Sequence, residues 1–507
     1  MRVRRSLLNF GTSALFLVVT MLVALKASPS LVAWLGPKRY GGARVVADGQ
    51  GYLTLLELGL GGAVGPLLAR AAGQGDLALL RETVSAGTRS YARVSVMTVA
   101  LGLSLTPLIP VFARDLSGAE LIDLRWAWVL GLLAFLSLGL LPLRALIEAK
   151  QRGYVVNLAL TAQSLAITGL SLFLAREGWG MTGQAAAQVA GVWGGSLLLA
   201  AIALRGEPSI RLATLLQPPR DEVSRAIRSL SAPTLILNIG SRVGLLADNL
   251  VVGGMLGASR VTSLAITQRL IVAGQGALQS VGSASWAALA ELHAQGRKDV
   301  FNRRLIEMTR IVAILAAAGL CPAVAFNREF VRLWMGADFD YGGDLVTVAA
   351  ALNAFLLAEQ SLWAWCFSAT GKTRVLVGPA VASAVVNLSA SLLLTRSMGL
   401  PGPLLGTTMG LAAVGLWTLP LLLRREFGTP VLPLAKAAGM PAVLGVAATA
   451  ALWPLAPTLS PLSWKLLAAI DGAVALGVLT AGVVLFVPSD EKEKWRSRIR
   501  LLRGMGS

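Results

Sequence analysis

The sequence has few charged residues and few tyrosines. Charged residues make up 14% of its 507 residues, whereas soluble domains average about 25%. This deficit excludes an ordinary water-soluble domain. A hydrophobic share of 55% and a mean hydropathy of +0.68 indicate a protein that crosses a membrane many times. Only 5 tyrosines and 13 phenylalanines occur, so the apolar residues are mainly aliphatic, which favours helices over the alternating strands of a membrane barrel.

The scarcity of cysteine and histidine excludes further kinds of site. Cys321 and Cys366 both fall inside predicted spans, so neither a disulfide framework nor a zinc site is indicated. His293 is the single histidine, so we expect no metal centre, no cofactor and no Ser-His-Asp set. Gly371-Lys372-Thr373 is not a phosphate-binding loop, because Cys366 stands where that motif needs its first glycine. The sequence therefore predicts a protein that is not an enzyme.

Long apolar stretches are what the sequence does contain. A spanning helix needs about 20 mostly apolar residues. We therefore expect an all-α polytopic membrane protein with about 14 transmembrane helices. The apolar run after the basic N-terminus is too long for a signal peptide and is interpreted as an uncleaved first span. The predicted spans begin near Leu7, Gly42, Ser90, Trp126, Val155, Thr182, Leu230, Val261, Leu305, Asp344, Val375, Pro403, Leu432 and Ser463.

The basic residues predict the orientation. The net charge of +19 would suggest nucleic acid for a soluble protein, but here the charge lies mostly in short loops, so we expect no nucleic-acid partner. With fourteen spans, 29 of the 45 Lys and Arg residues fall in the even-numbered loops and the two tails, and 10 fall in the odd-numbered loops. By the positive-inside rule, both termini are then cytoplasmic.

The two halves of the sequence resemble each other at a nearly constant offset. Leu35-Gly36-x-x-Arg39 returns as Leu256-Gly257-x-x-Arg260 after 221 residues, and Ser171-Leu172-x-Leu174-x-Arg176 returns after 220. Six spans in each repeat enter the bilayer in the same direction and predict two pseudo-symmetric lobes. The expected domains are an N-lobe at 1–205, a cytoplasmic linker at 206–228, a C-lobe at 229–425, and two further helices with a basic tail at 426–507.

Cations inside the spans are candidates for a substrate site, because buried charges in membranes normally face a cavity or a partner. Arg242 lies about twelve residues into span 7, and Arg269 about eight into span 8. Arg44 opens span 2, and Lys26 is expected close to the outer surface. If these four converge, their geometry suits a phosphate or diphosphate. The alternatives are a structural ion pair for Arg242, with Asp248 for example, and surface anchoring for Lys26 and Arg44.

Acidic and amide residues complete the candidate set. Asp48 follows Arg44 at i+4 and can pair with it. Asp48 is also the repeat equivalent of Arg269, which fits a salt bridge between the lobes that closes a gate. Glu57 and Glu359 are expected to bind protons or a cation, or else to make hydrogen bonds between helices. Polar residues expected to face the cavity are Asn238, Gln275, Gln279 and Asn353.

Several motifs together resemble the polysaccharide-exporter branch of the multidrug, oligosaccharidyl-lipid and polysaccharide (MOP) superfamily, the Wzx-like flippases, which are related to lipid II flippases. None of them is specific alone, but their order is. They are LGPKRYG from Leu35, LGLG from Leu58, DNLVVGGMLGASRV from Asp248, AALAELHAQGR, LWMGADF from Leu333, and Ser368-Ala369-Thr370-Gly371-Lys372 with Asn387 and Gly402.

The resemblance implies a flippase of the bacterial cytoplasmic (inner) membrane. Its substrate would be an oligosaccharide linked to undecaprenyl diphosphate, moved outward by alternating access for surface polysaccharide such as lipopolysaccharide. A polysaccharide polymerase or glycosyltransferase complex is the expected partner. Spans 13 and 14 would accommodate the lipid tail. The alternatives are a lipid II flippase, a cation-coupled multidrug exporter with an acidic cavity, a membrane-embedded glycosyltransferase or polymerase, and a scaffold subunit without transport.

Overall fold

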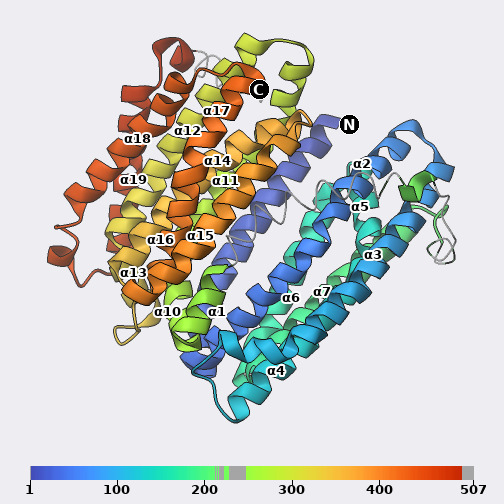
Figure 1. The fold of residues 1–507 in the computed structure, drawn as a ribbon, viewed down its shortest axis with the longest axis horizontal. Helices are drawn as coiled ribbons and strands as arrows, with labels where there is room; N and C mark the ends of the chain where they lie inside the picture. The colour runs from blue at the N-terminus through green and yellow to red at the C-terminus, as the bar shows by residue number, and fades with distance from the viewer. Residues whose placement is uncertain are drawn as a thin grey trace. The chain divides into compact units, whose positions relative to one another are not determined.

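The chain is almost entirely helical. The structure, a computed structural model, describes residues 2–211, 213, 215, 222–225, 227 and 247–493 (Figure 1). Within these ranges there is no β-strand, and 11 helices are long and apolar enough to cross a membrane. The protein is therefore a polytopic membrane protein, as the composition predicts. One of the eleven, Gly11–Leu56, contains two predicted spans, and the predicted seventh span falls largely outside the described residues.

The helices form two compact units. Unit 1 comprises the chain up to Ser263 together with Thr395–Pro403, and unit 2 comprises Leu264–Leu394 and the chain from Leu404 onward. Unit 1 thus contains the first repeat and also residues 247–263, which belong to the second repeat. The domain boundaries at 205, 228 and 425 stay a prediction.

Residues 2–206 of unit 1 form seven helices and three short 3-10 turns, and residues 247–255 of the same unit are also helical. The turn η3 joins α4 to α5, so that residues 119–149 form one continuous helical segment. The elements are α1 (Arg2–Leu53), η1 (Thr54–Leu56), α2 (Leu58–Gln74), α3 (Leu77–Leu105), η2 (Thr106–Phe112), α4 (Ala119–Leu132), η3 (Leu133–Leu140), α5 (Leu141–Ala149), α6 (Gly153–Arg176) and α7 (Gly180–Gly206).

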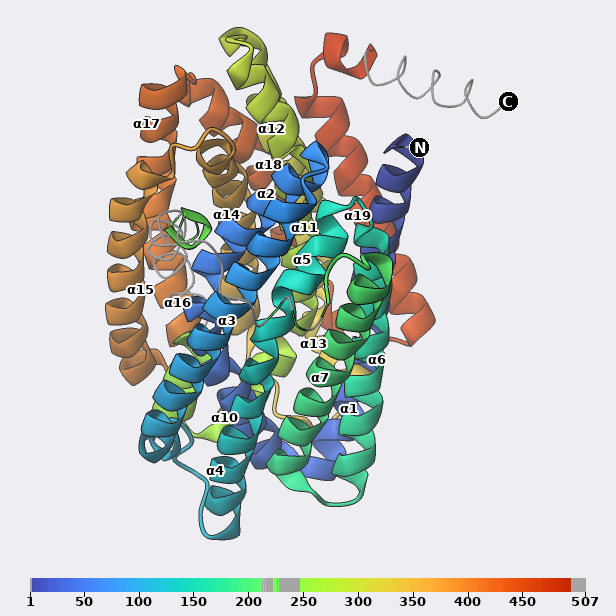
Figure 2. The same ribbon diagram turned by 90° about the vertical axis from the view of Figure 1, so that its right-hand side faces the viewer.

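Buried polar groups hold the helices of unit 1 together. The Trp128 indole of α4 is 1% exposed and donates to the Gly102 carbonyl of α3 at 2.8 Å. Gln50 of α1 donates to the Trp128 carbonyl at 3.1 Å, so one residue joins three helices. Asn157 of α6 donates to Thr12 and Ser13 of α1. The helices α6 and α7 pack along each other, as Figure 2 shows.

Unit 2 contains most of the second repeat and the last two helices. The helix α10 (Ala258–Thr267) crosses the boundary between the units. The other elements are α11 (Arg269–Ala294), α12 (Lys298–Ala325), α13 (Asn327–Met335), α14 (Asp344–Ala369), η4 (Thr373–Leu376), α15 (Val377–Met398), α16 (Gly402–Gly410), a π-helical turn η5 (Leu411–Gly415), α17 (Leu416–Phe427), α18 (Val431–Leu452), η6 (Pro457–Leu459) and α19 (Trp464–Phe486).

The helix α12 is central to unit 2 and packs against α11, α14, α18 and α19. The π-helical turn η5 frees backbone groups from the usual helical pattern, and the side chain of Gln360 donates to the Leu411 carbonyl there at 2.9 Å. Phe427 stacks on Phe301 at 5.1 Å between ring centroids and also contacts His293 and Phe367. His293 is therefore part of an aromatic cluster.

The short helix α13 ties the connection between α18 and α19 to unit 2. Glu329 accepts hydrogen bonds from Ser460 at 2.6 Å and from Arg332 at 2.8 Å. Arg332 also donates to the Leu462 carbonyl at 3.2 Å. Burial alone would raise the pKa of Glu329, but the bonds from Ser460 and Arg332 outweigh it and hold the pKa below its ordinary value. The carboxylate is therefore ionised and satisfied.

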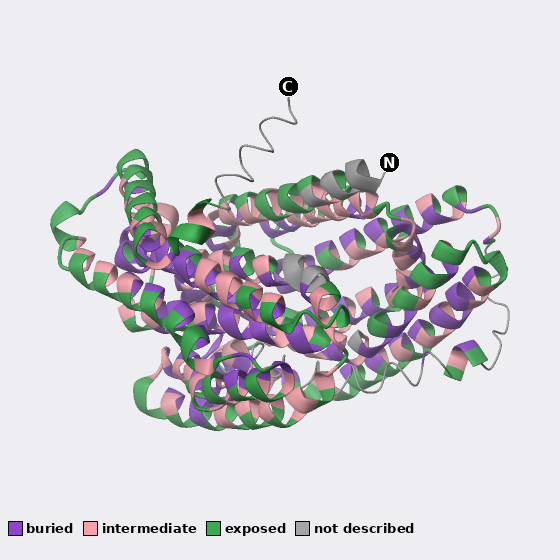
Figure 3. Ribbon diagram, turned by 90° about the horizontal axis from the view of Figure 1, so that it is seen from above, coloured by how far each residue is buried: buried purple, intermediate pink, exposed green. Residues whose placement is uncertain are grey.

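Large apolar side chains are exposed along many helices. Figure 3 colours all exposed residues of the ribbon green, whether apolar or polar. Trp417 and Val443 are each 68% exposed, and Leu476 is 64% exposed. Soluble monomers rarely expose large contiguous apolar areas, so these side chains fit a surface that faces lipid.

The backbone repeats with the same period as the sequence. Glycines with positive φ occur in three pairs that are each 221 residues apart. The pairs are Gly36 and Gly257 (77° and 101°), Gly75 and Gly296 (69° and 70°), and Gly178 and Gly399 (79° and 74°). The helices therefore break at equivalent positions in the two halves, which is the pseudo-symmetry that the repeat predicts.

We expect Glu329→Gln to lower the Tm of the purified protein, because a neutral amide loses charge-assisted bonds worth about 1.5–3 kcal/mol. The pKa of Glu329 is depressed in the folded state, so its contribution is present above the ordinary glutamate pKa of about 4.3 and is lost as the pH falls through the folded pKa. The Tm difference should therefore shrink toward acidic pH. Asp338→Asn, at an exposed loop position, is the control and should leave Tm unchanged. An equal Tm for Glu329→Gln and wild type at neutral pH would contradict the expectation.

Candidate functional site

The break in α1 places two of the predicted cations at a similar level. Gly36, with φ of 77° and ψ of 159°, divides α1 into residues 2–35 and 37–53. Lys26 lies ten residues before the break and Arg44 eight after it, about 15 Å and 12 Å at 1.5 Å per residue. The Lys26 side chain is exposed, and the helix continues nine residues beyond it. Lys26 is therefore farther from the helix end than expected.

Arg44 and Asp48 each have a partner other than the one predicted. The Arg44 guanidinium donates to the Tyr40 hydroxyl at 3.0 Å and lies 5.4 Å from the centroid of that ring. Asp48 accepts from the side-chain amide of Asn249 at 2.5 Å. The predicted ion pair between Arg44 and Asp48 is not formed, because Arg44 reaches back one turn and Asp48 faces the second repeat. Both charges remain within interaction range of each other.

Asn249 and Tyr52 belong to this polar cluster, although neither is among the site residues that the sequence predicts. Asp48 and Asp248 both interact electrostatically with the Tyr52 hydroxyl. The sequence feature that points to Asn249 as a polar site residue is its place next to Asp248 at the start of an apolar run. Periodicity alone does not show that this amide meets Asp48, which is 201 positions earlier in the chain.

In unit 2, Arg269 is the first residue of α11 and is half-buried. Gln275 and Gln279 follow on the same helix, four residues apart, and therefore share one face. Gln279 donates to Ser361 of α14 at 3.5 Å. Arg242 and Asn238 lie outside the described residues, so the convergence of the four cations stays a prediction.

Asn353 and Glu57 make hydrogen bonds between helices. Asn353 is 4% exposed, donates to the Leu404 carbonyl at 2.9 Å and accepts from Thr408 at 2.8 Å. Its amide therefore joins α14 to α16. Glu57 accepts from the Tyr91 hydroxyl of α3 at 3.2 Å, which matches the structural alternative that the sequence left open for it.

Glu359 is different, because it is 2% exposed and neither carboxyl oxygen has a hydrogen-bond partner among the described residues. Trp363, one turn further along α14, donates to Thr309 of α12 at 3.0 Å. Residues four apart share a helix face, so Glu359 lies on the face of α14 that packs toward α12. A role in binding a proton or cation stays a prediction.

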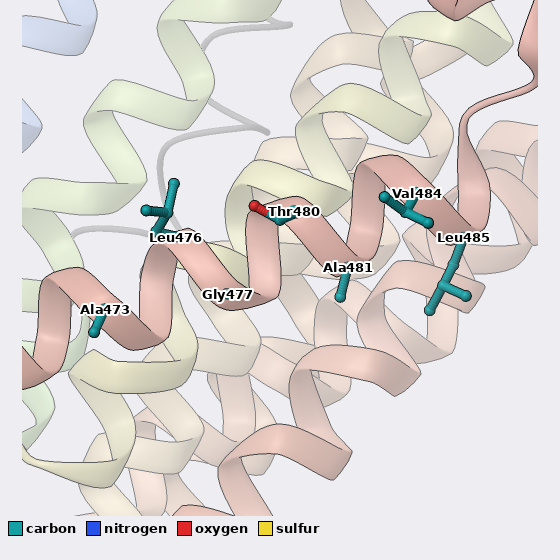
Figure 4. A pocket seen from close by; sticks show the side chains of 7 residues that line it. All are labelled: Ala473, Leu476, Gly477, Thr480, Ala481, Val484 and Leu485. Atoms are coloured by element: carbon teal, nitrogen blue, oxygen red, sulfur yellow. The ribbon is translucent and has the colours of Figure 1, made fainter.

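One face of the helix α19 forms a shallow apolar groove that opens widely to its surroundings and has a volume of about 690 Å³ (Figure 4). Three of its lining residues are glycine or alanine, and Thr480 contributes its one hydroxyl group. Its lining residues are Ala473, Leu476, Gly477, Thr480, Ala481, Val484 and Leu485.

The fold defines a class of membrane protein: two helical units built from a repeated sequence, with two additional helices at the C-terminal end. No protein-family model and no curated protein sequence matches the chain. Several solved structures, however, match the fold of the chain. An inward-closed structure of the lipid II flippase MurJ matches with a TM-score of 0.69 and 13% identity, covering 96% of this chain and 98% of that one.

Two structures of a multidrug resistance MATE family transporter of the MOP superfamily also match. The inward-facing conformation has a TM-score of 0.59 and 14% identity, and covers 87% of this chain and 98% of that one. The outward-facing conformation has a TM-score of 0.58 and 13% identity, with coverage of 88% and 96%. At such identities the likeness concerns the fold alone.

We expect Asn353→Ala to destabilise the protein rather than to impair a binding site. The change removes two interhelical hydrogen bonds and leaves the Leu404 carbonyl and the Thr408 hydroxyl to find other partners, at about 1–3 kcal/mol. Thermal unfolding in detergent should show a clearly lower Tm. Gln275→Ala at a half-buried position is the matched control and should change Tm little. A normal Tm together with lost transport in Asn353→Ala would instead place this amide in the substrate site.

Proposed function

We propose that the protein is a flippase of the MOP superfamily. It moves an oligosaccharide linked to a polyprenyl diphosphate from the cytoplasmic to the outer leaflet by alternating access. The observation that carries this proposal is the pair of cations, Lys26 and Arg44, set at a similar distance from the break in α1 on apolar helices. A charge within a membrane span is costly and normally serves a substrate or a partner, and of these two cations Arg44 is half-buried and Lys26 is exposed.

The chemistry of these cations suits a diphosphate. An arginine guanidinium can donate two parallel hydrogen bonds to phosphate oxygens, and a low-dielectric environment strengthens the attraction. Arg44 is held by the Tyr40 hydroxyl, which fixes its direction without neutralising it. In this proposal Arg242 and Arg269 supply the matching cations of the second repeat, and Asn238 and Gln275 contact the glycan.

The groove on α19 suits the polyprenyl tail. Lipid is as apolar as the groove, so moving a tail from one to the other gains little hydrophobic free energy. The groove would therefore act through its shape and not through added affinity. It would guide the tail while the diphosphate moves through the protein. The MurJ likeness covers 96% of this chain, which includes at least part of α18 and α19.

The energy source is proposed to be the substrate gradient, the membrane potential or a coupled ion, because the sequence has no ATP-binding loop. Asp48, Glu57, Asp248 and Glu359 are the candidates for gating or ion coupling. The proposed location is the bacterial cytoplasmic membrane, with both termini in the cytoplasm, and the proposed partners are the enzymes that assemble and polymerise the glycan.

Two other functions each have an observation in their favour. The likeness to MATE transporters favours a cation-coupled multidrug exporter, which would require the acidic residues to dominate the cavity. The likeness to MurJ favours lipid II as the substrate. Drug resistance on expression would support the first, and rescue of a strain that lacks its lipid II flippase would support the second. A knockout that accumulates lipid-linked oligosaccharide inside the cell supports the function proposed here.

We expect Arg44→Ala and Arg269→Ala each to reduce flipping of a fluorescent undecaprenyl-diphosphate oligosaccharide in proteoliposomes by roughly 10–100-fold. The estimate corresponds to the loss of one charge-assisted contact of about 1.5–3 kcal/mol. Arg176→Ala, at an exposed position near the end of α6, is the control and should flip normally. Wild-type flipping rates in both variants, with a normal Tm, would refute the assignment of the cations.

We expect Gly477→Leu to slow flipping of a long-chain polyprenyl substrate several-fold, because the new side chain extends into the groove. A substrate with a short tail should be unaffected. Gly472→Leu is the matched control: it lies on the same helix, outside the groove, and open space surrounds it as it does Gly477. Equal rates for the two variants with the long-chain substrate would exclude a role for the groove in holding the tail.

A further inference from the structure

Asp115 caps a helix that belongs to the other sequence repeat. Its carboxylate accepts from the Ala258 amide, from the Ser259 amide at 3.0 Å and from the Ser259 hydroxyl at 2.6 Å. These donors are at the N-terminus of α10, where helices have unsatisfied amides and favour negative charge. The preceding Gly257 has φ of 101°, and a Cβ atom there would lie 2.7 Å from the Asp115 carboxyl carbon. The site therefore requires glycine at 257.

The Asp115 carboxylate is ionised in this position. Burial alone would raise the pKa of Asp115, but the hydrogen bonds from Ser259 and Ala258 outweigh it, so the pKa lies below its ordinary value. Asp115 lies in the connection between η2 and α4, outside the membrane-spanning segments. The cap is thus a charge-assisted contact, which is stronger than a neutral hydrogen bond.

Further contacts join the same two parts of unit 1. Thr262, 1% exposed, donates to the Pro37 carbonyl at 2.6 Å. A Cβ atom at Gly41 would collide with the Ala258 carbonyl, and one at Gly253 would collide with the Phe112 carbonyl. At Gly41 and Gly253 the surfaces meet backbone to backbone, and Ala258 also belongs to a buried apolar cluster with Val46 and Leu116. Opening this contact therefore breaks the polar bonds and exposes part of that apolar cluster.

Unit 1 contains a second carboxylate cap that serves as an internal comparison. Asp123 of α4 accepts from the Met181 and Thr182 amides, both at 2.8 Å, and from the Thr182 hydroxyl at 2.6 Å. The chemistry matches that of Asp115, since each carboxylate holds two successive amides and one hydroxyl at a helix start. Both ends of the Asp123 cap lie in the first repeat, whereas the Asp115 cap joins the first repeat to the second.

We propose that Asp115 is the latch that holds residues 249–262 of the second repeat against the first repeat, and that it must release for transport. In the predicted orientation the latch is on the outer side, so its release opens the path to the outer leaflet. This inference rests on the proposed alternating-access function. Asp123, by contrast, stays bonded throughout the cycle because it connects two helices of the same repeat.

The first experiment does not need the substrate. Thr262→Cys is labelled in detergent with a maleimide, against native cysteines that are both buried. We expect Asp115→Ala to raise the labelling rate at position 262 at least several-fold, because the segment separates more often. Asp123→Ala should not raise it. Equal rates in all three backgrounds, or the same increase in both variants, would overturn the latch.

A second pair of variants distinguishes local opening of the segment from general unfolding of the protein. Gly41→Ala places a methyl group against the Ala258 carbonyl and should also raise labelling of Thr262→Cys. Gly65→Ala, where nothing lies within 4 Å of the new methyl group, should not. If Gly41→Ala labels like Gly65→Ala while both keep the wild-type Tm, the segment does not open as proposed.

The third experiment connects the latch to transport. The pair Asp115→Cys and Ser259→Cys is oxidised with copper phenanthroline in proteoliposomes that contain a fluorescent undecaprenyl-diphosphate oligosaccharide. We expect the disulfide to stop flipping and dithiothreitol to restore it, whereas a disulfide between Asp123→Cys and Thr182→Cys leaves flipping unchanged. Normal flipping with the 115–259 disulfide formed would refute the latch. If the reduced protein does not flip this probe, the proposed substrate is wrong, and the labelling experiment still decides the latch.

Discussion

Lipid offers no hydrogen bonds, and this constraint accounts for the hydrogen bonds between the helices of the protein. A polar group inside an apolar helix bundle has to find its partner within the chain. Trp128 therefore donates to the Gly102 carbonyl, Asn353 joins α14 to α16, and Gln360 bonds to a carbonyl of the π-helical turn. Each of these bonds fixes how two helices face each other, which apolar contacts alone do not specify as strictly. Glu359 departs from the rule, and that departure is what marks it as a candidate for ion binding.

At helix ends and in connections, carboxylates take the place of water as partners of unsatisfied donors. Asp115 and Asp123 each hold two amides at the start of a helix, and Glu329 holds the connection between α18 and α19. Carboxylates suit this task because the helix N-terminus carries partial positive charge. The caps of Asp115 and Asp123 make the same kinds of hydrogen bond, but they connect different parts of the chain. A contact inside one repeat strengthens that repeat, whereas a contact between repeats restrains the motion that the proposed alternating access requires.

The repeat links the architecture to the candidate site. The breaks at Gly36 and Gly257 are equivalent in the two halves, yet the residues around them differ. After Gly36 the helix carries Tyr40, Arg44 and Asp48, and the residues before Gly257 supply Asn249. The two halves therefore share the position of their helix breaks but carry different side chains near them, and the two halves meet where Asp48 accepts a hydrogen bond from Asn249.

By itself the sequence determined the helical fold, the membrane setting and the repeat, because hydropathy and helix breaks are properties of neighbouring residues. It also identified Arg44, Asp48 and Glu57 as charges that need a partner. Only the tertiary structure decided which partner each one has: Tyr40 for Arg44, Asn249 for Asp48, Tyr91 for Glu57. It likewise revealed the cap between Asp115 and Ser259, which are 144 positions apart. The physical reason is that a hydrogen bond depends on distance and direction in space, and a single sequence carries no measure of either for residues on different helices.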